Sequence, residues 1–452
     1  MHYTYTFIWC SGRNETKMQR APQALDRTNW HNAAAIWTLI KAKGRGYWTR
    51  AAIVLAVSVY ASHYVYENLN FRSISVSLFQ EVTELLPRQS VPRFTGLVVI
   101  QDEEYWAELG GRRPIKRDYL ARIVNALVEA NAHVIALDFD MRLPDAHTGT
   151  IPAEYMAETK QLIDAIKNAA IKRKKIVLST PLSLKDGEYY RDLDVYQVMG
   201  LCARQAPDSA ATKPPAGSDE DKIARNVTCG YIGLPYDFLA IPGRLPIVGE
   251  PALDSFALAI ARARNPSLIR RLEASQRIGE TDRYGSFISD KKFRNNDTMM
   301  RANELLGGSP RADIFEANAV LVGGEWSSQA AGRGPLIDLH NSPVGFIPGL
   351  FLHANFVEAI LDDRTFAPAP GWALHAIEVV FGIISGGVFA VLFHARAKMA
   401  GFMILVLTAF FAQWVLLHQL GMYFDALFPV AGLAIHSICE RLFERKAEES
   451  GG

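Results

Sequence analysis

The chain has 452 residues, of which 49% are hydrophobic and 21% are charged, and its mean hydropathy is +0.03. This average is too apolar for a soluble protein with so many charges and too polar for a bundle of membrane helices, so we expect the chain to contain both. The 48 lysines and arginines balance 47 acidic residues, which argues against nucleic acid as a partner. Four cysteines are too few for a disulfide scaffold and lack the spacing of a zinc site.

An apolar run with aromatic residues at its start, Tyr47–Tyr66, predicts a first membrane span. A cleaved signal peptide would place its apolar core nearer the start and a small-residue cleavage site after it, so we expect a retained anchor. Residues 1–46 form the expected cytoplasmic arm. The arm carries Trp30 and Trp37 among basic residues, a pattern suited either to lie on the inner membrane surface or to dock a partner helix.

Three more apolar runs occupy residues 372–440 and predict spans at Trp372–Phe393, Met399–Leu420 and Met422 to about Cys439. Eight lysines and arginines lie within residues 1–50, and both the turn at 394–398 and the tail at 441–452 are basic. Basic flanks stay in the cytoplasm. Four spans therefore place both termini in the cytoplasm and residues 67–371 outside it.

The outer segment alternates buried-strand and amphipathic-helix patterns. Strands are expected at 97–101, 133–138, 175–179 and 319–323, and helices at 117–130, 156–170, 254–264 and 350–361. This alternation predicts an α/β domain with a largely parallel sheet. Between residues 189 and 230 this pattern dissolves into DSAATKPPAGSDEDK, a stretch rich in proline, serine and charge that is typical of a surface loop.

Two cysteines, Cys202 and Cys229, bracket much of that expected loop. Because both lie on the oxidising side in the predicted topology, we expect a disulfide between them, worth roughly 3 kcal/mol by loop-closure entropy. The alternative is two free buried thiols. The other two cysteines, Cys10 and Cys439, are expected to stay reduced.

Acidic and histidine side chains follow the expected strands, where ligands of parallel sheets bind. These candidates for a ligand site are Asp102, Glu103, Asp138, Asp140, Asp338, His340 and His353. Such groups suit calcium or magnesium. The alternative is that they cap helices and satisfy loops, or pair with Arg112, Arg113 and Arg117. No nucleotide-binding or hydrolase motif follows a strand, so an enzyme is the poorer expectation.

Several segments resemble the type 2 CHASE family, the sensory domains attached to bacterial cyclases and kinases. LVVIQDEEYWAELG resembles the family's opening strand and acidic turn, and RDYLARIVNALVEANAHVIALDFDMRLPD resembles its next helix and strand. LPIVGEPALDSFALAIARA, AVLVGGEWSSQAAGRGPLIDLHNSPVG and IPGLFLHANFVEAILDDRTF are similar to later family segments in the same order. The resemblance extends over about residues 71–440. One departure is the turn at 111–117, where only Pro114 and Arg117 match the family pattern.

The resemblance implies an extracytoplasmic sensor in a bacterial plasma membrane, with an unknown ligand and no identified cofactor. Family members usually continue into a cyclase or kinase, whereas about twelve residues follow the last expected span here. We therefore expect a non-enzymatic, membrane-embedded and homo-oligomeric sensory subunit that signals to a separate effector. Two alternatives remain: a structural scaffold of a larger membrane complex, and a metal-dependent hydrolase using Asp102, Asp138, Asp140 and His340.

Overall fold

The computed structural model describes residues 91–142, 153–202, 214–233, 240–275, most of 278–370, helix 395–420 and scattered positions of 372–384 and 422–434. A six-stranded sheet in the order β11-β1-β12-β2-β3-β6 forms the centre of this part, and each pair of neighbouring strands is parallel. The strands are β1 (Thr95–Gln101), β2 (Val134–Leu137), β3 (Lys175–Thr180), β6 (Val227–Tyr231), β11 (Met299–Arg301) and β12 (Ala319–Glu325). The expected α/β class with a largely parallel sheet is confirmed.

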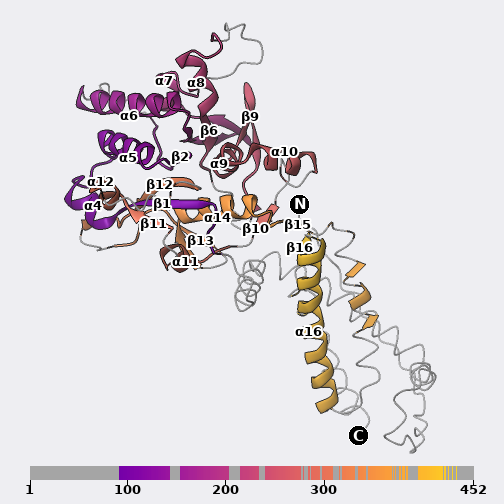
Figure 1. The fold of residues 1–452 in the computed structure, drawn as a ribbon. Helices are drawn as coiled ribbons and strands as arrows, with labels where there is room; N and C mark the ends of the chain where they lie inside the picture. The colour runs from indigo at the N-terminus through magenta and orange to yellow at the C-terminus, as the bar shows by residue number, and fades with distance from the viewer. Residues whose placement is uncertain are drawn as a thin grey trace, which may run out of the picture.

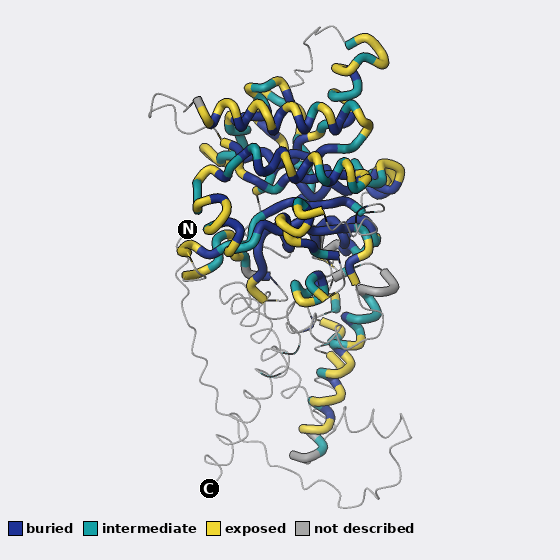
Figure 2. The backbone as a smooth tube through the Cα atoms, turned by 60° about the vertical axis from the view of Figure 1, so that its left-hand side comes forward, coloured by how far each residue is buried: buried dark blue, intermediate teal, exposed yellow. Residues whose placement is uncertain are grey.

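Helices cover both faces of this sheet (Figure 1). One face packs against α5 (Arg117–Glu129), α6 (Ala153–Ile171) and α12 (Ala302–Leu306), and the other against α9 (Phe256–Arg264), α10 (Pro266–Ala274), α11 (Asp290–Asn295) and α14 (Gly349–Leu361). Successive strand residues alternate between the two cores, so Val98 belongs to the core on the side of α5, α6 and α12, and Val99 to the core on the side of α9 and α14. Burial on both faces explains why the strands are continuous apolar runs. Figure 2 shows this buried centre between exposed outer helix faces.

The expectation of a surface loop over residues 189–230 is wrong for the parts that the structure describes, whereas residues 203–213 lie outside the described residues. This stretch contains the end of β5 (Glu188–Arg191), α7 (Val195–Val198), α8 (Asp219–Asn226) and the edge strand β6. The charged sequence of α8 is helical because the Ser218 hydroxyl accepts a hydrogen bond from the Asp221 N–H (3.1 Å) and acidic residues occupy the first turn, where the helix dipole favours them.

Three short hairpins lie outside the six-stranded sheet. They are β4 (Leu182–Lys185) with β5, β8 (Arg244–Ile247) with β9 (Glu250–Asp254), and β13 (Leu339–Ser342) with β14 (Gly345–Pro348), while the short helix α4 (Asp102–Ala107) follows β1. A second sheet has the order β16-β15-β10-β7 and consists of β7 (Ala240–Ile241), β10 (Arg283–Gly285), β15 (Thr365–Pro368) and β16 (Met422–Tyr423).

One helix, α16 (Ala395–Leu420), is long and apolar enough to cross a membrane over Met399–Leu416, by length and composition and among the described residues. It runs away from the α/β domain (Figure 1). The expected anchor at 47–66 lies outside the described residues, as does most of the spans expected at 372–393 and 422–439. Met422 and Tyr423, expected at the start of the last span, instead form β16.

A disulfide joins Cys202 to Cys229, whose Cα atoms are 5.8 Å apart. It ties the chain after α7 to the edge strand β6.

We expect reduction of the Cys202–Cys229 disulfide to lower the free energy of unfolding by about 3 kcal/mol, because the 27-residue separation gives the reduced unfolded chain more conformational freedom. The measurement is the urea midpoint of unfolding with and without reductant. The control is a variant with serine at Cys202 and Cys229, whose midpoint should not change with reductant. Equal midpoints for the oxidised and reduced protein would contradict this expectation.

Candidate functional site

The carboxyl ends of the parallel strands bring four of the seven candidate residues together. Asp138 directly follows β2, His353 lies in the second turn of α14, and Asp338 and His340 lie on or beside β13. The charge of Asp338 acts on both Asp138 and His353, and His340 acts on His353. We call these four side chains the Asp138 cluster.

The Asp138 cluster begins in the core and ends at the surface. Asp138 Oδ1 lies 3.9 Å from His353 Nε2, and both side chains are largely shielded from solvent. The His353 ring packs edge-on to Phe256 at 5.3 Å, and its Nδ1 has no hydrogen-bond partner among the described residues. A buried imidazole nitrogen without a partner is uncommon in native proteins.

The outer half of the cluster rests on the start of α14. His340 Nε2 lies 2.7 Å from Asp338 Oδ1, and the Gly349 N–H donates to the Asp338 carbonyl at 3.0 Å. A Cβ atom at Gly349 would lie 2.2 Å from Asp338 Oδ2, so the lack of a side chain there allows the carboxylate to approach the helix.

Burial sets the protonation of the inner pair. It raises the pKa of Asp138 to about 8, assisted by the negative charge of Asp338, and lowers the pKa of His353 to about 4. At neutral pH the Asp138 carboxyl is therefore largely protonated and the His353 imidazole is neutral. Each of the two neutral side chains can donate one hydrogen bond, from the carboxyl O–H and from the imidazole N–H, and each can also accept without a net charge.

Two further candidates, Asp102 and Glu103, lie in a different place. They line a cavity of about 660 Å³. The last residues of β1, β11 and β12, which are Gln101, Arg301 and Glu325, also line it, and so do Trp106, Ala107, Arg294 and Leu336. The Ser327 N–H donates to Asp102 Oδ1 at 2.7 Å, and the Ser327 hydroxyl donates to the same oxygen. We call this volume the β1 cavity.

The last candidate, Asp140, joins neither group. Its carboxylate accepts a hydrogen bond from the Arg142 N–H at 3.0 Å and lies 3.4 Å from the Arg142 side chain. The expected alternative partners, Arg112 and Arg117, are also occupied elsewhere. Arg112 donates to Glu158 at 2.8 Å, and Arg117 donates to Thr159 at 2.5 Å and to Tyr155.

The four residues of the hydrolase hypothesis do not converge. Asp102 follows β1 and Asp138 follows β2, and β12 lies between these strands, which separates the two strand ends by about 10 Å. Within the described part of the chain, no group of three or more histidine, cysteine or acidic side chains is placed to hold a metal ion. The arrangement does not favour metal-assisted hydrolysis.

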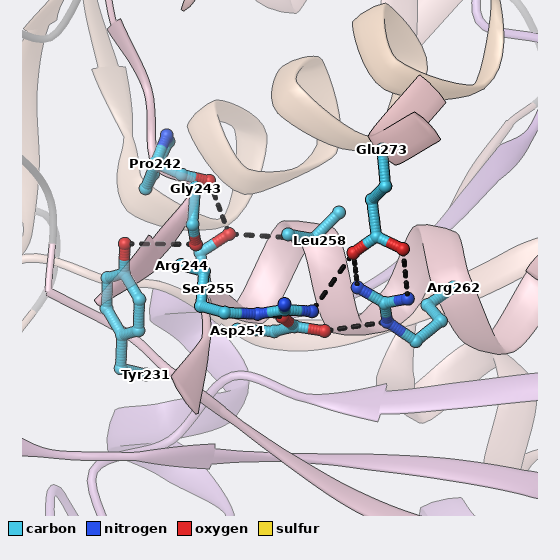
Figure 3. Close-up of polar contacts among 9 residues, drawn as sticks. All are labelled: Tyr231, Pro242, Gly243, Arg244, Asp254, Ser255, Leu258, Arg262 and Glu273. Carbon is cyan, nitrogen blue, oxygen red and sulfur yellow. Dashed lines mark hydrogen bonds and ion pairs between the residues drawn. The ribbon is translucent and has the colours of Figure 1, made fainter. Parts of the chain in front are cut away.

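A third polar group at this edge was not expected from the sequence. Arg244 and Arg262 lie between Asp254 and Glu273, with four nitrogen–oxygen distances of 2.7–3.0 Å (Figure 3). Hydrogen bonds from Arg262 lower the pKa of Glu273. Beside them the Ser255 hydroxyl caps α9 by accepting from the Leu258 N–H at 3.1 Å (Figure 3). The two cations and two anions neutralise one another, so we assign this network to holding the β8–β9 hairpin against α9 and α10.

Comparison with known proteins identifies the family of the chain. No curated protein and no solved structure matches the chain significantly. The CHASE2 domain family matches residues 52–392, which is more than half of the chain. This sensory family occurs extracytoplasmically in membrane proteins, in agreement with a helix suited to cross a membrane next to an α/β domain. The chain therefore belongs to the CHASE2 domain family.

Proposed function

We propose that this protein is a non-enzymatic membrane sensor whose outer α/β domain binds a small ligand at the carboxyl edge of its sheet and signals to a separate cytoplasmic effector. The observation that carries the proposal is the β1 cavity, at the edge where parallel sheets bind ligands, in a chain of a sensory family. A ligand can signal only by binding two states of the protein with different affinity. The proposal therefore needs a route from this edge to the membrane.

Helix α14 and the second sheet supply such a route. The start of α14 supplies His353 to the Asp138 cluster, and its Phe351 ring lies 5.0 Å from the guanidinium of Arg294, which lines the β1 cavity. After α14 the chain enters β15, which pairs in parallel with β16 through Ala367–Met422 and Pro368–Tyr423. Strand β16 follows the end of α16 (Figure 1). A displacement of α14 would thus reach α16 through one strand pair.

The pairing of β15 with β16 can be tested by crosslinking. We expect Ala367→Cys with Met422→Cys to form a disulfide readily, because aligned residues on neighbouring strands have Cα atoms about 5 Å apart. Serine replaces Cys10 and Cys439 in this background. Mass spectrometry of non-reduced peptides from the full-length protein in native membranes measures the link. Ala367→Cys with Met403→Cys, further along α16, is the control that should not link, and equal yields for both pairs would contradict the route.

Sensing itself is tested by ligand binding to the full-length protein in mild detergent. We expect at least one compound in a library of envelope metabolites, ions and peptides to raise the melting temperature, since a ligand that binds only the folded state stabilises it. Affinity purification of the tagged protein should also recover a cyclase, kinase or other effector without a sensor of its own. No thermal shift across the library, together with a stoichiometric partner that never responds to any compound, would favour the scaffold. A bound metal in elemental analysis would revive the hydrolase.

A further inference from the structure

We infer that the β1 cavity binds a zwitterionic amino compound, a free α-amino acid or a short peptide. This inference rests on the proposed sensor function and names its ligand class. The cavity lies where β1, β11 and β12 end together, since Gln101 is aligned with Glu325 and Val99 with Arg301. Its volume of about 660 Å³ is in the range of small-molecule sites.

Part of the charge in the cavity is already neutralised. Arg294 forms a close ion pair with Glu325 and lies 3.4 Å from Asp290, and its guanidinium also lies over the Phe351 ring. These contacts fix the guanidinium and balance its charge. The Arg294–Glu325 pair is therefore a wall of the cavity rather than a group that waits for a ligand.

One cation and one anion remain lightly engaged. Arg301 is half-exposed; its guanidinium lies 3.9 Å from the Glu304 carboxylate, and its charge also acts on the buried Glu104. Glu103 is exposed and has no hydrogen bond or ion pair within the described part of the chain. A ligand carboxylate can bind the Arg301 guanidinium through two hydrogen bonds, and a ligand ammonium can bind Glu103 beside the fixed carboxylate of Asp102. Both ligand charges are needed to match both protein charges.

Apart from Gln101 and the indole N–H of Trp106, the remaining wall is apolar. Trp106 packs edge-on to Tyr105 at 5.3 Å, and Tyr105 stacks on Trp326 at 4.2 Å. A Cβ atom at Gly111 would lie 2.2 Å from the Trp106 ring, so this glycine, with a φ of +62°, leaves room for the indole. Together with Leu336, Trp106 forms a surface that suits an aliphatic or aromatic side chain. The chemistry of the lining is thus that of an α-amino acid: two opposite charges and an apolar side chain.

The test is calorimetric titration of the full-length protein in detergent with each of the twenty α-amino acids and their homodipeptides. For a compound that binds, the N-acetyl derivative lacks the ammonium and the amide derivative lacks the carboxylate. We expect both derivatives to bind about 10- to 100-fold more weakly, the usual effect of losing a charge-assisted hydrogen bond. Arg301→Gln should weaken the zwitterion by a similar factor and leave the amide derivative unchanged, whereas Glu103→Gln should spare the N-acetyl derivative.

Two exposed residues provide matched controls. Lys160→Gln and Glu129→Gln remove one charge of each sign on α6 and α5 and should leave binding unchanged. The inference would be overturned if Arg301→Gln and Glu103→Gln both left the affinity for the zwitterion unchanged, or if the zwitterion and its derivatives bound with equal affinity. If no amino acid or dipeptide binds while another library compound raises the melting temperature, the ligand class is wrong and the sensor stands. If nothing in either set binds, the sensor proposal fails as well.

Discussion

Replacing Glu358 by alanine is expected to lower the free energy of unfolding by about 4 kcal/mol, because four donors, two of them buried on Thr95, would lose their acceptor. Glu358 lies in α14 and is fully buried. Its carboxylate accepts from the backbone N–H groups of Arg93, Phe94 and Thr95 at 2.8–3.1 Å and from the Thr95 hydroxyl at 2.7 Å. Alanine would leave these donors unpaired at the start of β1.

Two variants bracket this effect. Glu358→Gln keeps one acceptor oxygen and should fall between the wild type and alanine, whereas Glu304→Ala, at an exposed position of α12, should change stability by less than about 0.5 kcal/mol. Guanidinium unfolding of the full-length protein in detergent, followed by tryptophan fluorescence, measures the difference. A loss below about 1 kcal/mol for Glu358→Ala would mean that water replaces the carboxylate and that β1 is not held by α14.

The main elements of the fold are predictable because their apolar patterns are strong. The expected helix at 350–361 corresponds to α14, and the expected strands at 97–101 and 319–323 correspond to parts of β1 and β12. Strands β6 and β11 were missed because VTCGY and MMR are too short and too weakly apolar to show a period. The hydrogen bonds from the start of β1 to Glu358 of α14 join residues that are 263 to 265 positions apart in the sequence. A pattern in neighbouring residues cannot predict such a contact.

The sequence predicted the candidate site only through the rule that ligands of parallel sheets bind at the carboxyl ends of the strands. That rule gathered Asp138 and His353, but it could not show that β12 is inserted between β1 and β2, which puts Asp102 in a separate cavity. It also missed Arg301, because β11 itself was missed. Asp140 lies two residues beyond Asp138 and faces solvent, since the chain has left the sheet by that point.

The second large effect is a pH dependence of stability centred on Asp138. Burial raises its pKa from 3.8 to about 8 in the folded state. Between these values the folded protein holds a proton that the unfolded chain has released, so protonated Asp138 favours folding below pH 4 and this contribution is lost as the pH rises to 8. We expect the stability of the wild type relative to Asp138→Asn to fall by roughly 5 kcal/mol over that interval. Unfolding of both proteins in detergent at matched pH values measures it.

His353 contributes a dependence of stability on pH that is opposite in sign to that of Asp138, and it therefore serves as a control. Burial lowers its pKa from 6.5 to about 4, so its neutral form favours folding above pH 6.5 and that contribution is lost as the pH falls to 4. Relative to His353→Gln, the wild type should therefore gain about 3 kcal/mol from pH 4 to pH 6.5. The two slopes cancel below pH 6.5, so in the wild type this pair leaves a fall of about 2 kcal/mol between pH 6.5 and pH 8. A difference between the wild type and Asp138→Asn that does not change between pH 4 and pH 8 would contradict this expectation, because it would mean that Asp138 is ionised in the folded protein as it is in the unfolded chain.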